Sequence, residues 1–352
     1  MNERLVLAEA LLDLLPAEKI LAISREPATE RMQKLLVRNA VYLEKLGVLG
    51  FLTDQIEKWE PLDLFNRIHS PLEFLLERLQ EKPLLPERDL LYFEEHVRRL
   101  CAPHLKVPFS LYSAAALERE RNDILMEDKP GYRLEKEGPA FDRLSNLVAG
   151  AGKRIREMEP LLAEETFFFI RTLVVDFSLE GVLLYSSLPW QPGTVEIAPR
   201  LIAKREGHTR FSDALLELLT AAQLVHESRH QKHYYLFRCE DTEPVSIGQF
   251  GFVKPEFTGI PLNVTWSALP TTKPFHKFFT LAISIGWELR FLEASRGRGG
   301  LTDEEDRVVE SLIRRKRKYL LPLLVQGELF RDLFTPEGEH LLEKLFVWSG
   351  YH

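Results

Sequence analysis

The segment SDALLELLTAAQLVHESRHQKH, residues 212–233, does most to determine the expected fold. Its aliphatic residues recur at intervals of three and four, which predicts an amphipathic helix that buries one stripe. Ser212 is a good N-cap for this helix, and Phe211 can pack against Leu216 one turn later. The stripe consists of Leu215, Leu218, Leu219, Ala222 and Val225, and it is continued by His226, His230 and His233.

Two of these histidines belong to a His-Glu-x-x-His pattern. His226 and His230 are four residues apart, so they lie on one helix face with their Cβ atoms about 5–6 Å apart. Two imidazoles placed in this way can bind one metal ion, and a metal would satisfy both rings in an apolar stripe. Glu227 is the candidate catalytic residue, able to reach a metal-bound water or to orient a ligand. The alternative is a pair of core histidines bonded to backbone or carboxylate groups. His233 is interpreted as a residue that surrounds the ligands or lies on the surface, rather than as a third ligand.

A third ligand is expected downstream, and two candidates stand there. Glu288 lies in an apolar helical pattern that runs from Phe275 to Leu292, and it is the residue that a zinc peptidase of the two-His-plus-Glu type would use. His276 lies near the start of the same pattern, after the Pro270-to-Pro274 turn. Imidazole and carboxylate ligands suit both zinc and iron.

The chain around this segment is expected to be mainly α with a small central β-sheet, an α+β fold with the histidine motif on a buried helix. Leucine-rich helical patterns fill a helical N-terminal region, residues 1–130. Gly47 is expected to end one of them in a left-handed conformation, with Gly50 as the alternative if the helix runs further. A polar stretch with Pro130 and two glycines, residues 126–138, is the candidate boundary. Residues 140–352 then form the predicted metal-binding catalytic domain.

The predicted sheet comes from the middle of the chain, which is rich in aromatic and β-branched residues. Short strands are expected at 167–170, 173–175, 181–185 and 194–197, although a buried helix also fits the first of these. Helices are expected from Ala140 to Met158 and after a capping box formed by Thr302 and Glu305.

Composition excludes several classes of protein. The 352 residues are 45% apolar and 28% charged, as in globular proteins, and the net charge of −7 argues against general nucleic-acid binding. The basic run at residues 314–318 is interpreted as a solvated helix face. Two distant cysteines, Cys101 and Cys239, favour neither a disulfide scaffold nor a thiolate zinc site. With no membrane span and no secretion signal expected, the sequence predicts a cytoplasmic protein.

The sequence from about Ala140 to Glu293 resembles the α-ketoglutarate-dependent peptide β-hydroxylases that carry a His-Glu-x-x-His motif and tailor ribosomally made peptides. The resemblance rests on Ser186, on the turn at residues 192–195, on residues 224–232 and on the proline-flanked turn at 269–274 that leads into Phe275 and His276. The chain departs from the family pattern at Arg229, where members commonly have glutamine. It departs again at residues 271–274, where they tend to have an Asp-Pro-Arg-Pro-like turn.

The resemblance implies Fe(II) held by His226 and His230, with His276 as the third ligand, and open positions for α-ketoglutarate and oxygen. Lys273 or Arg290 would hold the distal carboxylate of α-ketoglutarate. The implied activity is hydroxylation of a side-chain β-carbon in a peptide, and the helical N-terminal region would either hold a leader segment of that peptide or extend the core.

Two other functions stay open from the residues themselves. The first is a zinc metallopeptidase, in which Glu227 deprotonates a zinc-bound water and Glu288 completes the site. The second is a non-enzymatic helical binding protein with structural histidines.

Overall fold

The computed structural model describes residues 3–45, 47–56, 58, 110–113, 139–170, 172–175, 185–187, 194–197, 212–237, 252–257, 259–264, 271–298 and 300–351. Most of these residues are helical, as the sequence predicts. The candidate boundary at 126–138, both cysteines, Phe211, and residues 181–184, 188–193 and 265–270 lie outside the described residues. Among the helices that are described, none combines the length and the apolar character needed to cross a membrane.

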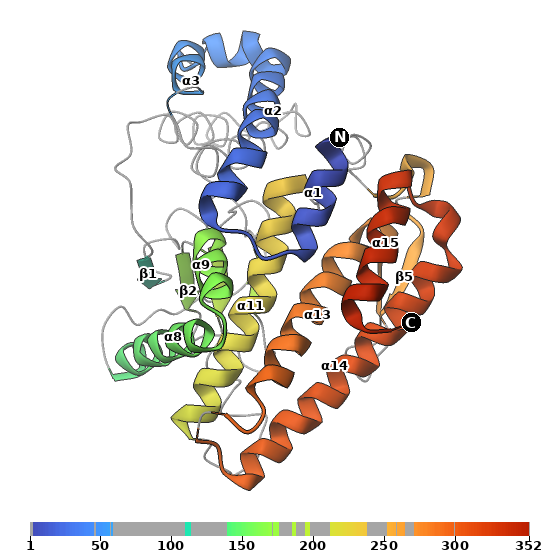
Figure 1. The fold of residues 1–352 in the computed structure, drawn as a ribbon. Coiled ribbons are helices and arrows are strands. Elements are labelled where there is room, and N and C mark those ends of the chain that lie inside the picture. Colours follow the sequence, from blue (N-terminus) through green and yellow to red (C-terminus); the bar gives the residue numbers. More distant parts are fainter. Residues whose placement is uncertain are drawn as a thin grey trace.

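Helix α11 (Asp213–Phe237) is the central element of the fold and carries the histidine motif. It contacts α13 (Phe278–Ser295) on one side, and α8 (Pro139–Met158) and α9 (Pro160–Phe169) on the other. Next to α13 lies α14 (Asp303–Leu329), so that α11, α13 and α14 form a row of three helices (Figure 1). The motif helix is therefore packed on both sides.

The chain ends complete this core. Helix α1 (Glu3–Leu12) packs on α11 and on α15 (Pro336–Ser349), which are far from it in sequence. Leu11 and Leu15 belong to one hydrophobic cluster with residues of α9, α11, α13, α14 and α15. The start of the N-terminal region therefore shares the core of the histidine-bearing part.

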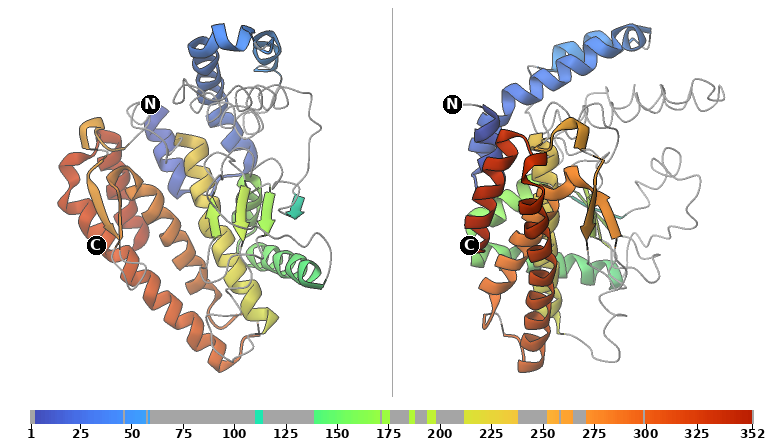
Figure 2. Two further views of the ribbon diagram at one scale, coloured as in Figure 1. Left: turned by 180° about the vertical axis from the view of Figure 1, so that it is seen from behind. Right: turned by 90° about the vertical axis from the view of Figure 1, so that its right-hand side faces the viewer.

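Helix α2 (Ala17–Lys45) leads away from the body towards α3 (Leu49–Gln55), as the two views of Figure 2 show. Gly47, between these helices, has a φ of 73°, a left-handed conformation that glycine adopts without steric cost. The predicted glycine ending is confirmed.

A four-stranded sheet lies beside α11 and α8 (Figure 2, left). Its order is β1-β2-β4-β3, with β1 (Ser110–Ser113), β2 (Thr172–Val175) and β4 (Thr194–Ile197) parallel and β3 (Tyr185–Ser187) antiparallel to β4. The strands predicted at 173–175 and 194–197 are confirmed.

Residues 167–170 do not form the predicted strand, because Phe167–Phe169 end helix α9. Pro160 stands in the first turn of α9, where a proline costs no helical hydrogen bond, and the side chain of Glu159 accepts from the backbone N–H of Leu161. These start signals precede the aromatic run, whose residues then pack into the core.

A second sheet pairs β5 (Pro261–Val264) with β6 (Thr271–Pro274) in antiparallel register, with Leu262 opposite Lys273. The side-chain amide of Gln326 on α14 bonds both backbone groups of Asn263 and so fixes this hairpin to the helix row. Three short 3-10 helices, η2 (Pro255–Phe257), η3 (Phe275–Lys277) and η4 (Arg331–Leu333), connect the remaining elements.

Candidate metal site

The start of α11 sets the position of the motif. The hydroxyl of Ser212 accepts from the backbone N–H of Leu215 at 3.2 Å, which confirms the predicted N-cap. The backbone N–H of Ser212 donates to Glu305 at the start of α14, and Glu305 also completes the predicted capping box with Thr302. One carboxylate therefore ties together the starts of α11 and α14.

His226 and His230 face each other one turn apart on α11. Their Nε2 atoms are 3.0 Å apart, with ring centroids 4.8 Å apart and ring planes inclined by 66°. Two nitrogens that bind one ion at 2.0–2.1 Å with an angle of 90–110° are separated by about 2.8–3.4 Å. The observed separation of 3.0 Å falls within this range, and it is also the length of an ordinary hydrogen bond.

Side chains of α13 hydrogen-bond the other ring nitrogen, Nδ1, of both histidines. Nδ1 of His226 is 2.8 Å from Oε2 of Glu288, and Nδ1 of His230 is 3.0 Å from Oγ1 of Thr280. Glu288 and Thr280 are eight residues apart on α13 and so share the face that contacts α11. Metal-bound histidines in proteins are usually fixed in this way, by a carboxylate or another acceptor on the second nitrogen.

The carboxylate of Glu288 has a second partner. Nζ of Lys316 on α14 donates to the same Oε2 at 2.6 Å, and the side chain of Glu288 is only 5% exposed. Burial by itself would raise the pKa of Glu288, but the charge of Lys316 and the hydrogen bonds from His226 and Lys316 outweigh burial and lower that pKa to about 2. Glu288 is therefore an anion at neutral pH.

This charge fixes the tautomer of His226. A carboxylate can only accept, so Nδ1 of His226 carries a hydrogen, and Nε2 presents a lone pair whenever it carries none. Two states of His230 are then possible. In the first, Nε2 of His230 carries the hydrogen and donates it to the lone pair of His226. In the second, the hydrogen is on Nδ1 of His230 and its Nε2 presents a second lone pair. The hydroxyl of Thr280 suits both states, because it donates to Nδ1 in the first and accepts in the second. The pair is compatible with a hydrogen bond and with a shared ion.

His230 has the protonation state that a ligand needs. Burial, followed by the charges of His226, His233 and Lys277, lowers the pKa of His230 well below its ordinary value. The ring is therefore neutral at physiological pH, and no proton has to be removed before Nε2 can bind a metal.

Glu227 is almost fully buried, at 3% exposure, and its Oε1 accepts from the side-chain amide of Gln223 at 3.3 Å. This candidate catalytic carboxylate, which directly follows His226 in the sequence, is therefore shielded from bulk solvent. Gln223, one turn earlier on α11, is a partner that the sequence analysis did not identify.

His276 is not grouped with His226 and His230. It lies in η3, and its charge is felt by His233. Burial, and then the charge of His276, lower the pKa of His233 to about 3. His233 itself is buried, at 4% exposure, with its ring edge-on to Phe252. Across the described ranges, no three His, Cys, Asp or Glu side chains are arranged to hold a metal ion.

The predicted co-substrate residues lie in two other places. Lys273 is on β6, in the hairpin that packs on α14. Arg290 is two residues after Glu288, which turns it about 200° around α13 and away from α11. Its guanidinium lies 4.8 Å from the ring centre of Trp348 and lines a cavity of about 360 Å³ between α13, α14 and the end of α15. Lys277, which follows His276 in η3, is a basic residue whose charge contributes to lowering the pKa of His230.

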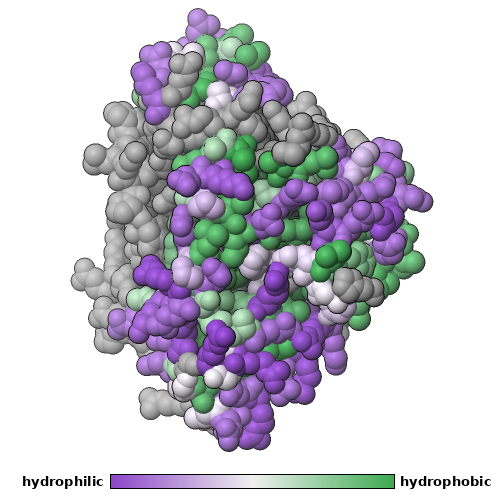
Figure 3. Space-filling model, in the orientation of Figure 1, coloured by the Kyte–Doolittle hydropathy of each residue, from purple (hydrophilic) through white to green (hydrophobic). Residues whose placement is uncertain are grey.

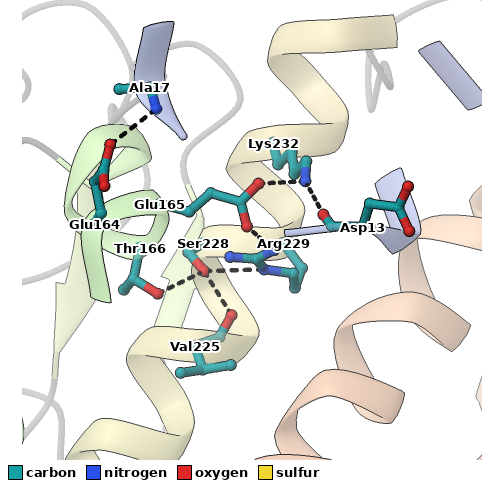
Figure 4. A network of polar contacts seen from close by, with 9 residues as sticks. All are labelled: Asp13, Ala17, Glu164, Glu165, Thr166, Val225, Ser228, Arg229 and Lys232. Atoms are coloured by element: carbon teal, nitrogen blue, oxygen red, sulfur yellow. Dashed lines mark hydrogen bonds and ion pairs between the residues drawn. The ribbon is translucent and has the colours of Figure 1, made fainter. Parts of the chain in front are cut away.

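A buried ionic cluster holds the motif helix from its other side (Figure 4). Glu165 on α9 pairs with Arg229 at 2.5 Å and with Lys232, and Lys232 also donates to the backbone carbonyl of Asp13 at 2.7 Å. All three charged side chains are completely buried. The guanidinium of Arg229 also lies 5.2 Å from the ring centre of Trp287. The face of this ring attracts a cation, which helps to stabilise the second positive charge that Glu165 alone does not neutralise.

The cluster gives Arg229, inside the motif, a role: its charge helps to keep the buried carboxylate of Glu165 ionised. Burial would raise the pKa of Glu165, but the charges of Arg229 and Lys232 outweigh burial and lower it, so the carboxylate remains ionised. Burial lowers the pKa of Lys232 to about 8. The cluster therefore fixes α11 to α9 and to the segment after α1.

Comparison with models of known protein families and with curated proteins gave no match.

Proposed function

We propose that this protein is a metal-dependent enzyme that binds iron through His226 and His230. The observation that carries the proposal is the 3.0 Å separation of the two Nε2 atoms, while both Nδ1 atoms are held by Glu288 and Thr280. The same separation also fits an N–H···N hydrogen bond between the two rings, so metal binding by the folded protein is the decisive test.

The activity we propose is Fe(II)- and α-ketoglutarate-dependent hydroxylation of a side-chain β-carbon in a peptide, as the resemblance implies. Bound iron with open positions would supply the oxidising chemistry with α-ketoglutarate and oxygen. The chain's own residues would hold the metal, fix the tautomers of its ligands and keep bulk water from Glu227. His276 remains our candidate for the third ligand, and Lys273 and Arg290 remain candidates for binding α-ketoglutarate.

The contact of Glu288 argues against a zinc peptidase of the two-His-plus-Glu type. A peptidase of the two-His-plus-Glu type would need a glutamate oxygen on the Nε2 side of the histidines. Glu288 instead approaches His226 from Nδ1, on the other side of the ring, where Lys316 holds it. In this position its carboxylate supports a ligand.

Anaerobic purification followed by loading with Fe(II) tests the metal site. We expect about one iron per chain, and a charge-transfer absorption band when α-ketoglutarate is added without oxygen. His226→Ala and His230→Ala should each lose the iron, whereas His340→Ala, on α15 where His340 bonds Glu9, should keep it. A folded wild-type protein that binds no iron would instead support structural histidines.

The role of Glu227 separates the two enzyme classes. In a peptidase, Glu227→Gln removes the base that activates the zinc-bound water, so turnover should be abolished. An oxygenase does not need that base, and the variant should keep part of its α-ketoglutarate turnover. Peptide cleavage with zinc that disappears in Glu227→Gln would overturn the oxygenase proposal.

A further inference from the structure

Lys316 belongs to the basic run of α14 but is oriented differently from its neighbours. Arg314, Arg315, Arg317 and Lys318 are exposed, in keeping with the hydrophilic surface along the lower part of α14 in Figure 3. The side chain of Lys316 is only 16% exposed. It occupies a place in the buried stripe of the helix, three residues after Ile313 and four before Leu320.

The contact made by Lys316 joins three helices at one atom. Oε2 of Glu288 accepts from Nζ of Lys316 at 2.6 Å and from Nδ1 of His226 at 2.8 Å. Two donors on one oxygen, from α14 and α11, leave a buried carboxylate little freedom to rotate. The direction of the His226 ring therefore depends on where Lys316 holds the carboxylate.

We infer that Lys316 is a positioning residue of the metal site: it holds Glu288 in place, and through Glu288 it aims Nε2 of His226 at the point that His230 also faces. This inference rests on the proposed function. Without Lys316, Oε2 of Glu288 would keep one of its two hydrogen-bond donors, Nδ1 of His226, and the carboxylate would be freer to rotate. His226 would then lose the fixed orientation that a ligand needs.

If Lys316 and Glu288 formed only a structural ion pair between α13 and α14, replacing Lys316 would have a different effect. Its loss would lower the free energy of unfolding without changing how the folded protein binds metal. Metal affinity, together with the spectrum of the bound metal, therefore distinguishes a positioning role from a purely structural one.

The experiment uses the full chain and Co(II), a spectroscopic probe for imidazole ligands. We expect Lys316→Met to weaken Co(II) binding by about 10- to 100-fold, the range for partners that orient metal ligands. The absorption bands of bound Co(II) should also shift, because the ligand geometry relaxes. Lys316→Arg keeps the charge and should restore part of the affinity, and Lys318→Met, on the exposed face of the same run, should bind as the wild type does.

The outcomes separate this inference from the proposed function. If the wild-type protein binds no metal, the proposed function fails. If the wild type binds Co(II), and Lys316→Met binds it with the same affinity and spectrum, the positioning role is wrong while the metal site stands. Lys316→Gln keeps a hydrogen-bond donor without the charge and provides the same comparison if the methionine variant does not fold.

Discussion

The carboxylate of Glu288 meets His226 at Nδ1, on the side of the ring away from His230. This relationship changes the role of a residue that the sequence offered as a third ligand. An oxygen 2.8 Å from Nδ1 would have to move around the ring to reach an ion bound at Nε2. In the proposed site Glu288 would therefore support a ligand, and its substitution should weaken metal binding without abolishing it.

Glu288→Gln tests this role. The amide oxygen can still accept from Nδ1 of His226, but the negative charge that holds Lys316 is lost. We expect metal affinity to fall by about 10- to 100-fold, as for other partners of metal-bound histidines, when measured by competition with a chelator. Loss as complete as in His226→Ala would show instead that Glu288 binds the metal directly.

Thr280 offers a second, smaller test of how the histidines are held. Thr280→Val keeps the shape of the side chain but removes the hydroxyl that bonds Nδ1 of His230, so metal affinity should fall by up to about tenfold. Thr280→Ser keeps the hydroxyl and should bind metal nearly as the wild type does. Equal losses in the valine and serine variants, in the same chelator competition, would contradict a role for the hydroxyl.

Local sequence signals predicted much of the fold because their physical causes are local. Ser212, the Thr302–Glu305 capping box and Gly47 act within a few residues, and the structure has each as expected. The strand predicted at 167–170 is wrong because a short apolar run has no period of its own. The cap at Glu159 and the proline at position 160 come earlier in the chain and start a helix there.

The contacts between helices could not be predicted in the same way. Thr280 bonds His230 because α13 packs on α11, and Lys316 bonds Glu288 because α14 packs on α13. Nothing near these two residues in sequence indicates a metal site. One signal was present, since a lysine in the apolar stripe between Ile313 and Leu320 must find a buried partner. The pattern required a partner, and the fold supplies it as Glu288.

The ionic cluster behind the motif predicts a large effect on stability. Glu165→Gln leaves Arg229 and Lys232 buried without a carboxylate, so the free energy of unfolding should fall by about 3–5 kcal/mol. Urea denaturation measures this change. Glu157→Gln removes only an exposed pair with Lys153, 3.7 Å apart, and should cost less than about 1 kcal/mol. Similar small losses in both variants would mean that the cluster contributes little.

Glu305 predicts how stability depends on pH, because it joins the starts of α11 and α14. Hydrogen bonds from Ser212 and Thr302 lower the pKa of Glu305 to about 2, from an ordinary value of 4.5. The unfolded chain therefore binds more protons in the acid range, and the stability contributed by this carboxylate is present above pH 4.5 and lost as the pH falls towards 2.

Comparison with Glu305→Gln isolates that contribution, because glutamine keeps the shape and cannot titrate. At pH 7 the wild type should be more stable by about 1 kcal/mol, a typical value for a helix cap, and the difference should shrink steadily between pH 5 and pH 3. Urea denaturation at each pH gives both free energies of unfolding, and Glu304→Gln, an exposed neighbour in the same turn, is the control. A difference that stays constant across this range would show that the carboxylate charge does not hold the two helix starts together.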